Sequence, residues 1–236
     1  MKFELLRTYT EENKINISED QINKYEKFTS MLIEKNKVMN LTAIDDEQGI
    51  EVKHLIDSLA GATVINELGL NDFSILDVGC GAGFPGMPLA IAYPNCSFTL
   101  LDSLNKRINF VHETASQLGL SKVRGIAARA EDYKERESFD YVTSRAVARM
   151  NVLLEYMLPF AKVGGYCILY KSGEYEDELT EAAKAIEILG GEYVKTVTFD
   201  LPADGGRRSL VLIKKISSTP EKYPRRAGKP SKSPIK

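Results

Sequence analysis

The sequence has few of the residues that hold metals or disulfides. Its 236 residues include three cysteines and two histidines. Cys80, Cys96 and Cys167 lie far apart, and none belongs to a C-x-x-C pair. Each falls within or beside a predicted strand, so we expect buried, reduced thiols and neither a disulfide nor a zinc site. We therefore expect no bound metal.

Long apolar runs are also absent. The longest uninterrupted runs fall far short of the roughly eighteen residues that a membrane span needs, and the amino terminus shows no signal-peptide pattern. We expect a cytoplasmic protein outside the membrane. An apolar fraction of 43% supports a substantial core, and the length suits one α/β domain with an appendage better than two equal domains. We expect a monomer.

The small net charge of −2 hides an asymmetry. Residues 214–236 hold eight basic residues and one acid, a net charge of +7, which leaves −9 for residues 1–213. An acidic body with a basic end suggests a polyanionic partner. From Ser217 onward, prolines among lysines and serines predict an extended, mobile tail.

Residues 74–102 are the stretch around which the rest of the chain is organised. A short apolar run ends at Val78, four glycines follow, and residues 87–93 have a helical pattern. A second apolar run ends on Asp102, about twenty residues past the glycines, where a Rossmann-like unit places its ribose-binding carboxylate. Glycines permit a tight turn and let a ligand approach the main chain. The stretch predicts a βαβ nucleoside-binding unit.

The glycine pattern fits two cofactors. Gly81-x-Gly83-x-x-Gly86 matches the dinucleotide signature. Asp77-x-Gly79-x-Gly81-x-Gly83 matches methyltransferases that use S-adenosylmethionine (SAM). A glycine turn that binds nothing would not require the acid after the second strand. At this point nicotinamide oxidoreductase and methyltransferase both remain open.

The region before residue 73 is predicted to be helical. Ser18 and Gln21 resemble a capping box, and Asp45 or Asp46 can cap a later helix. On that later helix His54 is expected to be a hydrogen-bonded histidine at the seam with the sheet, although a metal or acid-base role is an alternative.

Strand and helix patterns alternate after the glycine stretch. Strands are predicted over residues 123–128, 139–143 and 166–170, and helices over 103–118, 150–160 and 174–189. Ser103 is the expected cap of the first of these helices, and Gly119 ends it. Two final strands, near 193–199 and 209–214, are joined by a loop too short for a helical crossover, so they should pair antiparallel. Such an ending is typical of SAM methyltransferases and disfavours the dinucleotide interpretation.

Six motifs follow one another along the chain: Asn40-Leu41-Thr42-Ala43-Ile44, His54-x-x-Asp57-Ser58-Leu59, Asp77-Val78-Gly79-Cys80-Gly81-Ala82-Gly83-Phe84-Pro85-Gly86, Leu101-Asp102-Ser103, Ser144-Arg145-Ala146 and Tyr223-Pro224-Arg225-Arg226. Together they resemble the bacterial RsmG (GidB) family, which methylates the N7 nitrogen of a guanine in the 530 loop of 16S ribosomal RNA. The resemblance covers nearly the whole chain, and the phenylalanine-proline-glycine ending of the loop is more specific than the glycines alone.

The resemblance implies a class I SAM-dependent methyltransferase: a Rossmann-like α/β fold with a seven-stranded, mostly parallel sheet ending in an antiparallel hairpin. We predict a helical N-terminal region over residues 1–72, a SAM-binding domain over 73–216 and a basic tail over 217–236. The implied partner is 16S ribosomal RNA or the small ribosomal subunit, and the implied product is S-adenosylhomocysteine.

Eight residues are candidates for binding SAM, some implied by the resemblance and the others by the glycine loop and the acid after the second strand. They are Gly79, Gly81, Gly83, Phe84, Asp102, Ala130, Glu131 and Arg145. All follow the carboxyl ends of predicted parallel strands, where ligands of open α/β sheets bind. Asp102 can accept both ribose hydroxyls, Glu131 can bind the adenine edge, and Phe84 can pack on the cofactor.

No acid-base catalyst is assigned, because guanine N7 carries a lone pair and no proton at neutral pH. Arg145 and Lys171 end adjacent strands and are candidates for positioning the target phosphate or, for the arginine, the guanine edge; the alternative for Arg145 is an ion pair with an internal acid such as Glu131. Further RNA-binding candidates are Arg207, Arg208, Lys222, Arg225, Arg226, Lys229 and Lys232. Removing residues 217–236 is expected to weaken RNA binding and leave SAM binding intact.

Two other functions fit the same residues. A methyltransferase of a small molecule or a protein explains the cofactor loop but not the basic tail. A ribosome-assembly or RNA-binding factor that senses SAM without turnover explains both and predicts no methyl transfer.

Overall fold

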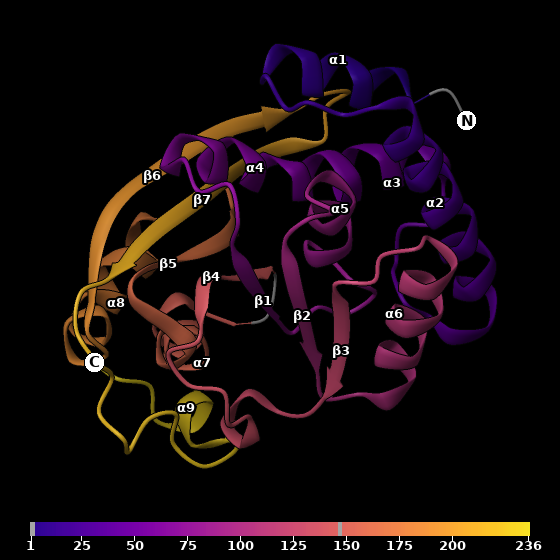
Figure 1. Ribbon diagram of the computed structural model, residues 1–236. Helices are drawn as coiled ribbons and strands as arrows, with labels where there is room; N and C mark the ends of the chain where they lie inside the picture. The colour runs from indigo at the N-terminus through magenta and orange to yellow at the C-terminus, as the bar shows by residue number, and fades with distance from the viewer. Residues whose placement is uncertain (1–2, 146–147) are drawn as a thin grey trace.

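The computed structural model describes residues 3–145 and 148–236 and contains one mixed sheet (Figure 1). Its strands are β1 (Ser74–Val78), β2 (Ser97–Asp102), β3 (Val123–Ala127), β4 (Phe139–Arg145), β5 (Ala161–Ser172), β6 (Gly191–Leu201) and β7 (Gly206–Lys215). In these ranges seven strands are ordered β3-β2-β1-β4-β5-β7-β6. The strands from β3 to β5 are parallel, and β7 runs antiparallel to both β5 and β6. The predicted fold class and its antiparallel hairpin are confirmed.

Helices cover both faces of the sheet, which explains the nearly continuous apolar runs of its central strands. Ile75 of β1 packs in the cluster that holds α5 (Gly86–Ala92) and α6 (Asn105–Gln117). The next residue, Leu76, packs in the opposite cluster with α7 (Met150–Met157) and α8 (Glu176–Ile188). Successive side chains of one strand therefore supply two cores.

The first four helices and one π-helical turn pack on the α5 side of the sheet. They are α1 (Glu4–Glu12), α2 (Glu19–Met39), α3 (Glu47–Ile50), the π-helical turn η1 (Glu51–Ile56) and α4 (Asp57–Leu68). The capping box before α2 is confirmed, with Ser18 Oγ accepting from the Gln21 amide at 3.3 Å. Asp46 caps α3 by accepting from the Gly49 amide at 2.7 Å.

Helix α2 is tied to the sheet domain through α5. The buried Tyr25 hydroxyl donates to the Pro88 carbonyl at 2.9 Å, and Gln21 Nε2 donates to the Ile91 carbonyl at 2.8 Å. Side chains of α2 and of the sheet belong to one apolar cluster. The helical region and the sheet thus share a core, and the division of the chain at residues 72 and 216 stays a prediction.

The expected cap at Ser103 is wrong. Helix α6 begins at Asn105 after Leu104, which makes no side-chain cap. The carboxylate of Asp102 instead fixes the turn before the helix, because its Oδ1 accepts from the Leu104 amide, two residues later, at 2.9 Å. The predicted end of the helix is confirmed, with Gly119 in a left-handed conformation at φ 67°.

The expectation of an extended tail is wrong for residues 219–235. This segment folds back beside α7 and contains the short helix α9 (Lys229–Lys232) (Figure 1). Tyr223 and Ile235 are buried in the α7 cluster. Arg225 forms an ion pair at 2.6 Å with Glu155, which is fully buried on α7. A buried carboxylate requires a partner, and this one lies seventy residues away in the sequence, so composition alone does not reveal it.

Cys80, Cys96 and Cys167 are free and buried, as predicted. In the two described ranges no three histidine, cysteine or acidic side chains gather where they could hold a metal ion. Across those ranges, too, no helix is both long and apolar enough to span a bilayer.

Candidate active site

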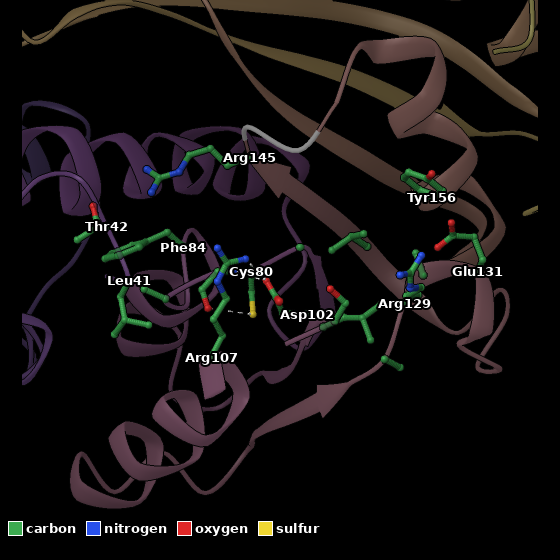
Figure 2. Close-up of a pocket in the computed structure, with 18 of the residues that line it drawn as sticks. Leu41, Thr42, Cys80, Phe84, Asp102, Arg107, Arg129, Glu131, Arg145 and Tyr156 are labelled. Carbon is green, nitrogen blue, oxygen red and sulfur yellow. Dashed lines mark hydrogen bonds and ion pairs between the residues drawn. The ribbon is translucent and has the colours of Figure 1, made fainter. Parts of the chain in front are cut away.

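A cavity of about 630 Å³ lies over the carboxyl ends of β1, β2, β3 and β4 (Figure 2). Seven of the eight residues expected to bind SAM line it, coming from four different strand ends. The lining residues among them are Gly79, Gly81, Phe84, Asp102, Ala130, Glu131 and Arg145. The eighth, Gly83, belongs to the loop but does not line the cavity; it faces α5, where a Cβ would meet Met87 Cγ at 2.5 Å.

The glycine loop is shaped by two different requirements. Gly81 has φ 58°, and a Cβ built on it would meet no described atom within 4 Å, because that side of the residue faces open space. Gly86 has the opposite surroundings, since a Cβ there would approach Asp77 Oδ2 to 2.8 Å and Leu100 Cγ to 2.9 Å. Gly81 therefore leaves room for a ligand, whereas Gly86 permits close packing of the helix on the strand.

Asp102 is fixed by three donors. Its Oδ2 accepts from the Gly81 amide at 3.0 Å and from Arg107 Nη1 at 3.1 Å, and its Oδ1 accepts from the Leu104 amide. A carboxylate has about four lone-pair sites, so one remains on Oδ1. A ribose diol that donates twice needs a second site, and of the three donors only the Arg107 side chain can move without moving the backbone. Arg107 was not among the predicted site residues, although its position five residues after Asp102, in the first turn of the next helix, is a usable signal.

Asp77 supports the loop from below. Its Oδ2 accepts from the Gly86 amide at 2.8 Å, while its Oδ1 has no hydrogen-bond partner within the part of the chain that the structure describes. Burial raises the pKa of this carboxyl to about 7, opposed by the Gly86 amide. Asp77 is thus a structural acid that carries a proton more readily than an ordinary aspartate.

A histidine, a phenylalanine and an arginine form one wall of the cavity. The His54 ring stacks on the Phe84 ring with centroids 4.4 Å apart. The Arg145 guanidinium lies 5.1 Å from the centroid of the Phe84 ring, and both side chains are labelled in Figure 2. Phe84 is 5% exposed, so most of its surface is already covered by protein. Its partners hold it at the edge of the cavity.

Both ring nitrogens of His54 are engaged, which confirms the hydrogen-bonded histidine. Nδ1 lies 3.1 Å from Arg145 Nη2 and accepts from it, because a guanidinium only donates. Nε2, 2.7 Å from Thr42 Oγ1, therefore carries the proton and donates. Burial lowers the pKa of His54 to about 3, and the charge of Arg145 acts in the same direction. The ring is neutral at physiological pH.

Arg145 pairs with an internal acid, and that acid is Asp57, at 2.8 Å, instead of Glu131. Burial raises the pKa of Asp57, while Arg145 opposes the rise. The spacing His54-x-x-Asp57 gave a signal, since residues three apart share a helix face. Ala146, the last residue of the Ser144-Arg145-Ala146 motif, lies outside the described residues.

Lys171 does not reach the larger cavity. Its Nζ pairs with Glu178 at 2.7 Å and donates to the Ala148 carbonyl at 3.2 Å. It lines a neighbouring pocket of about 430 Å³, which shares His54 and Arg145 with the larger cavity and also contains Lys53, Asp57 and Arg208.

The basic tail meets the cavity at its Glu131 end. The Gly228 amide donates to Glu131 Oε1 at 3.4 Å. Four of the predicted RNA-binding residues in the tail are exposed: Lys222, Arg226, Lys229 and Lys232. Arg225 is instead held by Glu155, so its guanidinium serves the fold. At the start of β7, Arg208 lines the smaller pocket, whereas the neighbouring Arg207 lines a separate pocket with Gly173 and Glu176.

Comparison with solved structures places the fold among methyltransferases. TYW2 of M. jannaschii, solved in complex with AdoMet, superposes with a TM-score of 0.56 at 16% identity, over 74% of this chain and 80% of that one. A methyltransferase from Burkholderia thailandensis gives a TM-score of 0.53 at 16% identity, over 68% and 79%.

Comparison of sequences finds relatives of much higher identity. Ribosomal RNA small subunit methyltransferase G of Alkaliphilus oremlandii is 48% identical, with 94% of each chain covered. The protein of the same name from Staphylococcus carnosus is 44% identical over 100% of this chain and 99% of its own. The family model described as GidB, rRNA small subunit methyltransferase G, matches residues 21–211. With the cavity and the sheet order, these matches show that the chain belongs to the rRNA small subunit methyltransferase G (GidB) family.

Proposed function

We propose that this protein transfers the methyl group of SAM to the N7 nitrogen of a guanine in the 530 loop of 16S ribosomal RNA. Membership of the GidB family supports ribosomal RNA of the small subunit as substrate. The observation that carries the proposal is the 630 Å³ cavity, in which the open side of Gly81 and the carboxylate of Asp102 meet. Action as a cytoplasmic monomer is part of the proposal.

The residues of the cavity fit SAM. A volume of 630 Å³ is in the usual range for small-molecule sites. Asp102 supplies an acceptor for the ribose, Ala130 and Glu131 supply polar groups for the adenine edge, and the Gly79–Gly81 backbone can be approached closely. When bound, SAM supplies an electrophilic methyl group on a sulfonium.

The side chains around this cavity suit an acceptor that has no proton to lose. His54 is a poor base because its pKa is about 3 and both of its ring nitrogens are hydrogen-bonded. Asp77 is buried beneath the loop and does not line the cavity. Guanine N7 presents a lone pair in the ring plane, so its methylation needs orientation and no general base.

Orientation is the contribution that the chain is built to make. Arg145 is held by Asp57, by His54 and by the Lys53 carbonyl at 3.2 Å, so its remaining N–H groups point in fixed directions. Holding acceptor, methyl carbon and sulfur in line can lower a barrier by roughly 7 to 11 kcal/mol. Fixed donors and dipoles add to this without reorganising during the reaction.

The test is a methyl-transfer assay with radiolabelled SAM on small subunits, and on RNA extracted from them, from cells that lack the protein. We expect incorporation that maps to one guanine of the 530 loop as 7-methylguanine. Label in another base or in a protein would refute the proposal. Tight RNA binding without any incorporation would favour a SAM-sensing assembly factor. Binding of NADH in place of SAM would favour a nicotinamide oxidoreductase.

A further inference from the structure

The smaller pocket holds more positive charge than the acidic side chains of the described residues balance. Its lining includes the cationic side chains of Lys53, Arg145, Lys171 and Arg208 and one carboxylate, that of Asp57. Arg145 is balanced by Asp57 at 2.8 Å, and Lys171 by Glu178 at 2.7 Å. Over residues 3–145 and 148–236, Lys53 has no ion-pair partner, and Arg208 reaches only the already paired Asp57, at 3.6 Å. Two positive charges are left over.

Three separate elements bring these charges to one place. Lys53 lies on η1, Arg145 ends β4, and Arg208 lies near the start of β7, opposite Ser172 at the carboxyl end of β5. The neutral His54 adds no charge, because burial and Arg145 keep its pKa low. A pocket with excess positive charge and solvent access binds anions.

The position of the pocket indicates which anion it binds. It shares His54 and Arg145 with the cofactor cavity, so a ligand in it lies next to the place where the methyl group is transferred. A base presented to that place is joined through its ribose to phosphates on either side. Lys53 and Arg208 are therefore placed where the backbone of the target nucleotide must pass.

Building on the proposed function, we propose that the 430 Å³ pocket is the subsite for the phosphodiester backbone at the target nucleotide, held by Lys53 and Arg208. Asp57 then has a second task. It neutralises Arg145 and leaves the two outer cations for the phosphates. Asp57 also stays near the acceptor, where a carboxylate offsets the positive charge that the purine gains on methylation.

The test uses the full-length protein with Lys53→Gln, Arg208→Gln and both together. Lys184→Gln, on the exposed face of α8, is the matched control for loss of one positive charge. We expect a higher KM for RNA in each pocket variant and no change in the control. Each cation that neutralises a phosphate of single-stranded RNA contributes about 0.7 to the salt slope. The double variant should flatten the slope by about 1.4, so that between 50 and 200 mM salt the wild type loses on the order of sevenfold more affinity.

Three further measurements make the outcome decisive. The dissociation constant for SAM, measured by calorimetry, should stay within twofold in all variants, and a parallel loss of SAM binding would overturn the subsite. Arg208→Lys should restore most of the salt slope, which a merely structural role of the side chain would not predict. Competition by micromolar guanosine 5′-monophosphate or inorganic phosphate would assign the pocket to a free anion and overturn the RNA backbone.

The failure of this inference can be told apart from failure of the proposed function. A wild type that methylates RNA, with pocket variants of unchanged KM and salt slope, overturns the subsite alone. A wild type that binds SAM and transfers no methyl group to RNA overturns the proposed function and the subsite with it.

Discussion

The ion pair between Arg225 and Glu155 yields a sharp prediction about stability. Glu155 is 0% exposed. Its Oε1 accepts from the backbone amide of Arg225 at 2.8 Å and from Arg225 Nε at 2.9 Å, and its Oε2 accepts from Arg225 Nη2 at 2.6 Å. Arg225→Ala removes the guanidinium and leaves a buried carboxylate with only an amide donor. Breaking a buried pair in this way costs roughly 3–5 kcal/mol.

We expect about 3 kcal/mol, at the low end of that range, because the Arg225 side chain is 18% exposed and water can reach part of the site. The assay is urea unfolding followed by circular dichroism. Arg226→Ala is the matched control, since its exposed side chain makes no ion pair with another described residue; a surface change of this kind stays within about 0.5 kcal/mol.

A double-mutant cycle separates the charge from the loss of packing. In a Glu155→Gln background the carboxylate is gone, so Arg225→Ala should cost only about 1 kcal/mol, the value of an ordinary hydrogen bond. If Arg225→Ala alone costs less than about 1 kcal/mol, or if the cycle shows no coupling, the argument that the tail is anchored by this pair is refuted.

Three other predictions follow from the site. Gly81→Ala and Gly119→Ala each place an alanine at positive φ with no described atom within 4 Å of its Cβ, so each variant should lose about 1–2 kcal/mol of stability. Only Gly81→Ala should weaken SAM binding measured by calorimetry. Equal SAM affinities of the two variants would contradict the assignment of the cavity. The pKa of Asp77 rises from 3.8 to about 7 on folding, so the folded state holds the proton more tightly than the unfolded state does. The free energy of unfolding should therefore fall by at most about 4 kcal/mol as the pH rises from about 4 to about 7. Asp77→Asn should remove this fall in unfolding curves measured across that pH range, and an unchanged fall would count against a buried carboxyl with a raised pKa. The exposed basic residues of the tail are Lys222, Arg226, Lys229 and Lys232. Replacing all four with glutamine should flatten the salt slope of RNA binding in a filter assay by about 2.8 and leave SAM binding unchanged. An unaltered slope would rule these side chains out as RNA contacts.

Neutralising charges replaces removal of the whole tail as a test. The sequence suggested that residues 217–236 could be deleted without harm to SAM binding. Tyr223, Ile235 and the partner of Glu155 lie in that segment, and the Gly228 amide donates to Glu131 in the cavity wall. Deletion would expose apolar surface and unpair a buried acid, so a loss of RNA binding would not identify its cause.

The sheet and its cofactor loop could be predicted from the sequence because their signals are local. Apolar runs that end in glycines fix where β1 stops, and the short connection before β7 requires an antiparallel pair. The capping box at Ser18 and Gln21 is visible three residues apart. Such patterns need no knowledge of distant partners.

Contacts between distant residues were the part that could not be predicted. The alternative considered for Arg145 was an ion pair with an internal acid such as Glu131, which follows the preceding strand. The acid that it pairs with is Asp57, on a helix 88 residues earlier. Lys171 lines the smaller pocket, as its place at the end of β5 allows, but its ion pair with Glu178 was not visible in the sequence. The cap expected at Ser103 does not form, because α6 begins two residues later, at Asn105. The Asp102 carboxylate instead holds the preceding turn through the Leu104 amide.

The place of β7 in the sheet constrains how the chain can be made. This strand lies between β5 and β6, yet it is the last of the seven described strands to leave the ribosome. Until it is synthesised, β6 has no hydrogen-bonding neighbour and β5 presents an open edge. Domains fold as units during synthesis, so the completed sheet, and any activity that depends on Arg208, must wait until β7 itself has been synthesised.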